Sequence, residues 1–205
     1  MTEDAPGDDG GSPPRRRNAS ATREAILNSA VAAFTRAGYD GAGVREVAGD
    51  AGVTAMLVNR YFGSKEQLFA EAVDRAFAPR TVVGDDLATL AEQVAARLVA
   101  RTAPEAEDPD PFLLMLRSAA NPRAAEIIRA GVQHHVGRHL THLLPGPNAA
   151  QRAELLLSLI AGVWLMRIVI STDGLSEADP TWLTGQLRDL VQVIVDRPAD
   201  PAAEA

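Results

Sequence analysis

Apolar residues recur along most of the chain at every third or fourth position, which is the spacing of one face of an α-helix. The clearest example runs from Thr22, a predicted N-cap, to Gly38, a predicted helix end. The apolar positions on its inner face are Ile26, Leu27, Ala30, Val31, Phe34 and Ala37. Runs with the alternating pattern of strands are hard to find. The pattern therefore predicts an all-α protein.

Short runs of Gly, Pro and polar residues separate the remaining predicted helices. Two short helices are expected at about 44–51 and 54–61, and Ser64 is expected to cap a longer one that reaches about Phe77. Further helices are predicted near 86–102, 111–119, 122–143, 148–171 and 180–196. Asn121 followed by Pro122 reads as an N-cap with proline at the first helical position.

Residues 44–62 have the pattern of two helices that meet at a sharp angle. Gly52 tolerates the positive φ of the turn, and Ala48 is small where the two backbones approach. The predicted inward positions are Val47, Ala48, Ala51, Val53, Val58 and Tyr61. The outward face of the second helix then consists of Thr54, Ala55, Met56, Leu57, Asn59 and Arg60.

In a helix-turn-helix, this outward face lies in the major groove of DNA. Asn59 suits adenine, and Arg60 suits guanine or phosphate, while apolar Met56 and Leu57 suit thymine methyl groups. On these residues alone, a plain αα-hairpin that binds no nucleic acid remains the alternative.

Four short segments extend the motif in both directions. They are Gly38-Tyr39, Val44-Arg45-Glu46-Val47-Ala48, Ala51-Gly52-Val53 and Tyr61-Phe62-Gly63-Ser64-Lys65-Glu66. With the residues between them, over about 22–73, the sequence closely resembles the DNA-binding region of the TetR/AcrR family of regulators. The resemblance implies a three-helix head, a variable all-α body, a homodimer, and repression that a small molecule relieves.

The resemblance also implies roles for single residues. Tyr61 and Phe62 would close the core of the head, and Lys65 would touch phosphate. The full set of predicted DNA contacts is Arg45, Thr54, Ala55, Met56, Leu57, Asn59, Arg60, Tyr61 and Lys65. The sequence departs from the family at Gly43, where Ser or Thr is usual, at Leu57, where Thr is frequent, and at Asn59, where Tyr is frequent. These departures put a simple transfer of the family's contacts in doubt.

Charge is distributed unevenly along the chain. The net charge is −7, yet residues 13–75 carry nine Lys or Arg against seven Asp or Glu, so the basic excess lies where DNA is expected. Arg15, Arg16 and Arg17 could reach a minor groove or phosphates, or could form a solvated basic tail. Lys65 is the only lysine.

These observations predict four segments. They are a disordered arm at 1–20, a helix-turn-helix DNA-binding domain at 21–65, a helical regulatory and dimerisation domain at 66–197, and a disordered tail at 198–205. Both ends are acidic or rich in small residues, Gly and Pro, and can bury little apolar surface.

Two apolar segments of the body suggest a homodimer. The stretch 155–170 is apolar nearly all round, and the last helix carries a stripe of Leu183, Leu187, Leu190, Val191 and Ile194. Together they predict a four-helix interface, with burial inside a monomer as the alternative. An unknown small-molecule effector is expected to bind bulky or polarizable residues, with an Arg or His as polar anchor. The candidates are Phe77, Phe112, Met115, His134, Trp164 and Arg167.

Other functions find little support in the sequence. There is no cysteine, phosphate-binding glycine loop, nucleophile elbow or HExxH motif, so an enzyme is not predicted. His135, His139 and His142 have helical spacing, but no acid or thiol lies beside them, and we predict neither a metal nor a cofactor. We expect a cytoplasmic protein whose partners are a near-palindromic double-stranded operator, a second copy of itself and the effector, with no membrane. A helical protein-interaction module is the alternative function.

Overall fold

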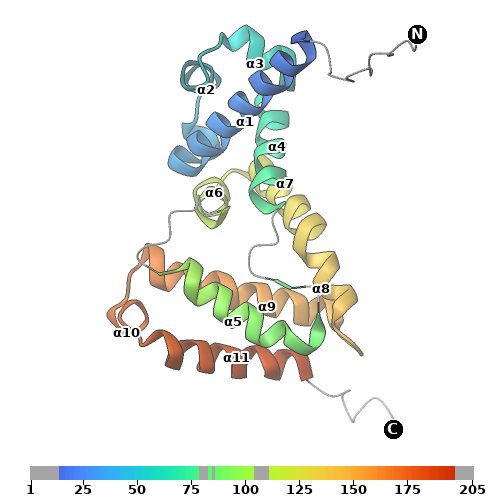
Figure 1. Ribbon diagram of the computed structural model, residues 1–205, viewed down its shortest axis with the longest axis vertical. Coiled ribbons are helices and arrows are strands. Elements are labelled where there is room, and N and C mark those ends of the chain that lie inside the picture. Colours follow the sequence, from blue (N-terminus) through green and yellow to red (C-terminus); the bar gives the residue numbers. More distant parts are fainter. Residues whose placement is uncertain (1–13, 79–82, 85, 104–110, 197–205) are drawn as a thin grey trace, which may run out of the picture.

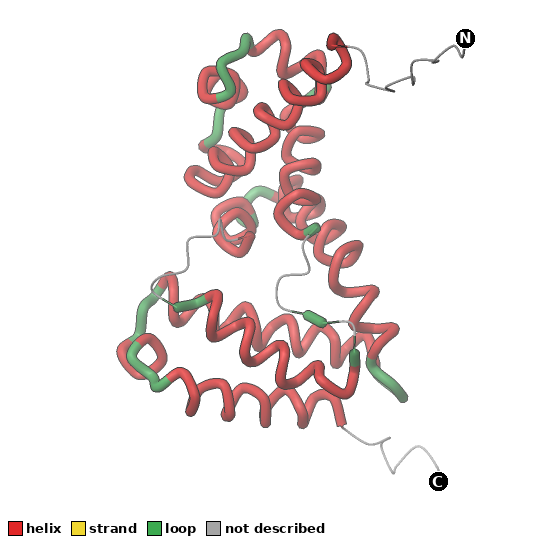
Figure 2. The backbone as a smooth tube through the Cα atoms, viewed as in Figure 1, coloured by secondary structure: helices red, strands yellow, loops and turns green. Residues whose placement is uncertain are grey.

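The computed structural model describes residues 14–78, 83–84, 86–103 and 111–196, and every regular element in these ranges is helical (Figures 1 and 2). The α-helices are α1 (Pro14–Gly41), α2 (Val44–Asp50), α3 (Ala55–Phe62), α4 (Lys65–Phe77), α5 (Leu90–Arg101), α6 (Pro111–Ser118), α7 (Pro122–Val132), α8 (Arg138–Leu143), α9 (Ala149–Trp164), α10 (Asp173–Ser176) and α11 (Pro180–Asp196). A 3-10 turn, η1 (Leu87–Thr89), precedes α5, and π-helical turns η2 (Gln133–Gly137) and η3 (Leu165–Val169) continue α7 and α9. The predicted all-α fold is confirmed.

Buried side chains form two separate cores. The first core joins α1–α4 to α6 and α7, and its largest side chains include Phe34 and Phe69. The second core joins α5, α8, α9 and α11, which lie together at the bottom of Figure 1. The packing of the head therefore continues past residue 65 into α4, α6 and α7.

One continuous helical segment crosses from the first core to the second within the described ranges. Ile128 of α7 is buried in the first core and Leu140 of α8 in the second. Between them, Val132 packs against the first core and Val136 against the second. The crossing therefore falls in the π-helical turn η2, visible where α7 runs down to α8 in Figure 1.

The first helix begins earlier than the sequence pattern predicts. It starts at Pro14, so residues 14–20 are helical, and only residues 1–13 of the predicted arm lie outside the described chain. Thr22 is not an N-cap, because its hydroxyl donates to the carbonyl of Asn18 at 2.8 Å in the helix interior. The small polar residues before Thr22 do not stop the helix, and proline suits its first turn. The predicted tail at 198–205 also lies outside the description.

The apolar stripe of the last helix is divided between two faces. Leu183, Leu187 and Val191 are buried in the second core, where α11 packs on α5. Leu190 is 52 % exposed, while Ile194 is half-buried. Placing Leu187 in a dimer interface was therefore wrong, because a helix with two apolar faces does not reveal from its sequence which face its own chain covers.

The end of α1 is fixed to α6 by hydrogen bonds and close packing. Arg117 donates from Nη1 to the carbonyls of Thr35 at 2.7 Å and Arg36 at 2.8 Å. The backbone N–H of Tyr39 donates to the buried Ser118 hydroxyl at 3.0 Å. Gly38, with φ 69° and ψ 179°, lies so close to α6 that an added Cβ would be 2.3 Å from the Arg117 carbonyl oxygen.

We predict that Gly38→Ala destabilises the protein much more than Gly52→Ala. Both glycines have positive φ, which costs alanine about 1–2 kcal/mol. Gly52 has open space around it, whereas Gly38 would force α1 and α6 apart at a further cost of about 1–3 kcal/mol. Urea unfolding of both variants measures the difference, and equal losses would contradict the tight α1–α6 contact.

Candidate nucleic-acid interface and effector site

The predicted helix-turn-helix forms at α2 and α3. Gly52 has φ +67° in the turn between them, as its position predicts. Thr54 caps α3 by accepting a hydrogen bond from the N–H of Leu57 at 3.3 Å. Gly63 ends α3 at φ +77°, and the Ser64 hydroxyl then caps α4 by accepting from the N–H of Gln67 at 3.2 Å. These local signals set the directions of α3 and α4.

The inward residues pack as the spacing predicts. Val47, Ala48 and Val58 are buried, while Ala51, Val53 and Tyr61 are partly buried against the first core. Phe62 is buried, with the guanidinium carbon of Arg23 lying 4.9 Å from the centre of its ring. This packing fixes the rotation of α3 about its axis, and hence the residues that it exposes.

The predicted DNA-contacting residues lie at the surface in graded degrees. Met56 is 82 % exposed, while Ala55, Leu57, Tyr61 and Lys65 are partly buried. Arg45, Thr54, Asn59 and Arg60 are exposed. Within the described part of the chain, the side chains of Asn59 and Arg60 form no hydrogen bond. They are therefore available to a partner, and Met56 is an apolar projection at the start of the same helix.

Lys65 stands at the start of α4 beside the ring of Tyr39. Its Nζ lies 4.8 Å from the ring centre, which holds the cation near the N-terminus of the helix. Burial raises the pKa of Tyr39, so its hydroxyl stays neutral to a higher pH than that of an ordinary tyrosine. The arrangement presents a positive charge at the edge of the candidate DNA surface.

Gly43 precedes α2 without a side chain to cap it. Instead, the Glu46 carboxylate accepts from the Gly43 N–H at 3.3 Å. The hydrogen bond from Arg36 lowers the pKa of Glu46, and the Gly43 N–H lowers it further. The glycine therefore loses the hydroxyl that would reach phosphate, but the first turn of α2 keeps a hydrogen-bonded start.

The six predicted effector residues do not gather in one place. Phe77 and Met115 belong to or pack on the first core, whereas Phe112 and Trp164 lie in the second, their rings stacked at 5.2 Å. His134 is exposed.

Arg167 is buried, and it caps the end of α5. Its Nη1 donates to the Thr102 hydroxyl at 2.6 Å and more weakly to the Val99 carbonyl at 3.4 Å. Burial lowers its pKa. The Nε of Arg167 and the Nε1 of Trp164 are buried, and neither has a hydrogen-bond partner among the described residues. The guanidinium group is therefore engaged partly in helix capping, an arrangement that sequence spacing could not reveal.

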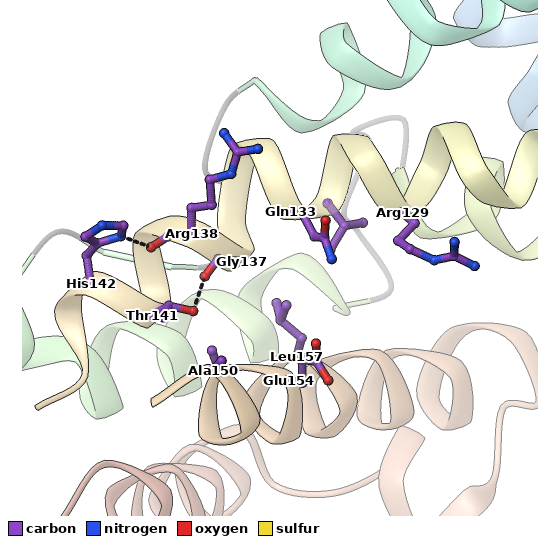
Figure 3. Close-up of a pocket in the computed structure, with 11 residues that line it drawn as sticks. Arg129, Gln133, Gly137, Arg138, Thr141, His142, Ala150, Glu154 and Leu157 are labelled. Carbon is purple, nitrogen blue, oxygen red and sulfur yellow. Dashed lines mark hydrogen bonds between the residues drawn. The ribbon is translucent and has the colours of Figure 1, made fainter. Parts of the chain in front are cut away.

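A groove between α7–η2–α8 and α9 was not anticipated from the sequence (Figure 3). Its volume is about 410 Å³, within the range of small-molecule sites. We call it the α7–α9 groove. Its lining residues are Arg129, Val132, Gln133, Gly137, Arg138, Thr141, His142, Ala150, Ala153, Glu154 and Leu157. None of the six predicted effector residues is among them.

The three histidines with helical spacing make separate contacts. His135 pairs with Asp74 at 3.1 Å, His139 with the Gly84 carbonyl at 3.0 Å, and His142 with the Arg138 carbonyl at 2.5 Å. The π-helical turn alters the angular spacing between them, since it has more residues per turn than an α-helix. In the described ranges, no group of three His, Cys, Asp or Glu could hold a metal ion.

The chain thus has a helix-turn-helix whose second helix is exposed, and a helical body that carries it. This is the arrangement of helix-turn-helix DNA-binding proteins. Residues 26–72 match the family model for bacterial regulatory proteins of the tetR family. Residues 88–195 match the model for the C-terminal domain of tetracyclin repressor-like proteins. The chain belongs to the TetR family and is a DNA-binding transcriptional regulator.

Solved structures agree with this fold. A transcriptional regulator from Rhodococcus sp. Rha1 is 27 % identical, with a TM-score of 0.60 over 85 % of this chain and 96 % of that one. A TetR-family regulator from Streptomyces coelicolor A3 is 24 % identical, with a TM-score of 0.54 over 91 % and 99 %. The multidrug binding protein EbrR, in complex with proflavin, is 18 % identical, with a TM-score of 0.58 over 85 % and 99 %. No curated protein sequence matches the chain.

Among the described helices, none is long and apolar enough to cross a membrane.

We predict that the DNA contacts divide by role. Lys65→Ala should weaken binding to all sequences alike and lower the salt dependence by about one charge, because a lone ammonium at a helix N-terminus reads phosphate. Asn59→Ala or Arg60→Ala should cost roughly 1–3 kcal/mol and relax preference at particular base pairs. Fluorescence anisotropy on selected and random duplexes measures both effects.

Arg97→Ala is the matched control, since Arg97 is an exposed arginine on α5, outside the head. It should leave both affinities unchanged. Equal losses on specific and random DNA for all three head variants would rule out the division.

Proposed function

We propose that the protein is a homodimeric repressor in the cytoplasm, that it binds a near-palindromic operator through α3, and that a small-molecule effector releases it. It regulates by binding and is not an enzyme. The observation that carries the proposal is the exposed α3 face, where the side chains of Asn59 and Arg60 have no hydrogen-bond partner in the described chain, on a head anchored to a separate helical body. Membership of the TetR family supports the same reading.

Apolar exposure on α9, η3 and α11 supports the dimer. On α9 and η3, Leu155, Met166 and Val169 are exposed, and in the described chain no atom lies close to where a side chain at Gly162 would start. Leu190 and Val193 are exposed on α11. Exposed apolar residues concentrated on neighbouring helices mark a protein interface. A second copy of the chain is the partner we propose for them.

The two-core architecture supports release by a ligand. The first core contains the head, and the second contains the helices proposed to dimerise, so the angle between the cores sets the distance between the two heads. A ligand that prefers one angle shifts the balance only by its differential affinity, and moving it from 99:1 to 1:99 takes about 5.5 kcal/mol.

A mobility shift with the intergenic DNA upstream of the protein's own gene tests the proposal directly. We expect a saturable complex that weakens steeply with salt, and protection of two half-sites about one helical turn apart or somewhat more. No preference for this DNA, or for any duplex selected from a random pool, would favour the helical interaction module instead.

We predict that Leu190→Asp gives folded monomers, while Leu187→Asp unfolds the chain. Leu190 is 52 % exposed in the single chain and would place an unpaired charge in the interface, at a cost of several kcal/mol to association. Leu187 is 3 % exposed and would place the charge in the second core. Sedimentation equilibrium and circular dichroism separate the two outcomes.

Gln192→Asp is the control, because it adds the same charge at an exposed polar position on the side of α11 that faces away from Leu190. It should remain dimeric. A wild-type protein that sediments as a monomer at micromolar concentration, or a dimeric Leu190→Asp variant, would contradict the interface.

A further inference from the structure

The α7–α9 groove lies where the two cores meet. Val132, on its α7 side, packs against the first core. Ala153 and Leu157, on its α9 side, belong to or pack against the second core. A molecule in the groove would therefore contact residues of both cores at once. Its size and shape would affect the angle between the two cores.

The wall of the groove is the π-helical turn η2, which supplies Gln133 and Gly137. A π-helical turn inside an α-helix is an irregularity that is frequent at functional sites. This turn is also where the helix crosses from one core to the other. His135, in the same turn, pairs with Asp74 of α4 at 3.1 Å, so the turn contacts the helix that leads to the head.

The lining contains apolar residues on both sides of the groove and two arginines on the α7–α8 side. Val132, Ala153 and Leu157 form the apolar part. In Figure 3, Arg129 lies at one end of the groove, whereas the guanidinium group of Arg138 points away from α9. In the described chain neither arginine has an ion-pair partner. The lining also contains one acid, Glu154, on the α9 side.

We propose that the α7–α9 groove binds a small amphipathic anion, with its apolar chain on Val132 and Leu157 and its acidic group at Arg129, while Arg138 adds a second positive charge to the lining. An arginine that is not already paired is a strong partner for a carboxylate. Glu154 repels an acidic group placed beside it on the α9 side. The inference deepens the proposed function. Only one part of it rests on that function, namely that a ligand in the groove releases the protein from DNA.

Three probes of equal chain length test the ligand class. Octanoate, octan-1-ol and octylammonium are titrated into the full-length protein by calorimetry. We expect octanoate to bind roughly tenfold more tightly than octan-1-ol, which is the effect of one charge-assisted hydrogen bond. Octylammonium should bind most weakly. Equal affinity for octanoate and octan-1-ol would overturn the proposal.

Variants locate the site. In the double variant Arg129→Gln/Arg138→Gln, the affinity for octanoate should fall to that for octan-1-ol. The affinity for octan-1-ol should not change. Arg97→Gln removes an arginine outside the groove and should change neither. Glu154→Gln should tighten octanoate. An octanoate preference that survives the double arginine variant would overturn the assignment.

Filling the groove gives an independent test. Leu157→Trp should abolish binding of octanoate and octan-1-ol, with circular dichroism to check folding. Gln133→Trp does the same from the opposite wall at an exposed position, where folding is not at risk. Octanoate binding that is unchanged in both folded variants would show that the probe binds elsewhere and would overturn the proposal.

A DNA titration separates the two layers of inference. Octanoate should weaken binding of the wild-type protein to its selected operator and leave the Leu157→Trp variant unaffected. Operator binding that octanoate does not change would overturn the coupling while the calorimetric result stands. A protein that binds no duplex at all would refute the proposed function, and the calorimetry would still decide the ligand class of the groove.

Discussion

The anchoring of the last turn of α1 on α6 is the contact on which the placement of the head depends. Arg117 reaches two carbonyls at the end of α1, and the Ser118 hydroxyl receives the Tyr39 N–H. Gly38 leaves no space between the two backbones. Because a buried hydrogen bond and backbone sterics make this contact, α1 cannot tilt on α6 without leaving the buried Tyr39 N–H unpaired. Helix α3 packs in the same first core, so this contact also restricts its position.

Arginine caps recur elsewhere in the molecule. Arg152 and Arg167, both buried, project from α9 and η3 to carbonyl groups at the ends of α11 and α5. A guanidinium group carries several donors in a fixed plane, and its charge is favourable beside a helix C-terminus. In the body, these arginines thus donate to free carbonyl groups at the ends of neighbouring helices. Such hydrogen bonds fix the relative orientation of the helices, which apolar contacts alone do not.

Local signals in the sequence were enough to predict much of this fold. Gly52, Ser64 and Asn121 act through residues within a few positions of themselves, and each has the predicted role. The inward side of α3 followed from spacing alone. These features are decided by backbone sterics and short hydrogen bonds, which a sequence displays directly.

Features decided by distant partners were not predictable in the same way. Leu187 is buried and Leu190 exposed because α5 covers only one of the two apolar faces of α11. The capping role of Arg167 depends on Thr102. The π-helical turn at Gln133–Gly137 lies where the two cores meet, and no local sequence pattern marks it. The effector candidates were chosen by residue type, and the structure assigns them to both cores instead of one cavity.

The separation of the two cores also affects how such a regulator can diversify. Exposed positions on α9 and in η2 line the groove, yet they take no part in the packing around Phe34 and Phe69. Substitutions there change the chemistry of the groove at little cost to the stability of the head. Descendants of one ancestral protein could therefore exchange the signal to which they respond while keeping the DNA address at which they act.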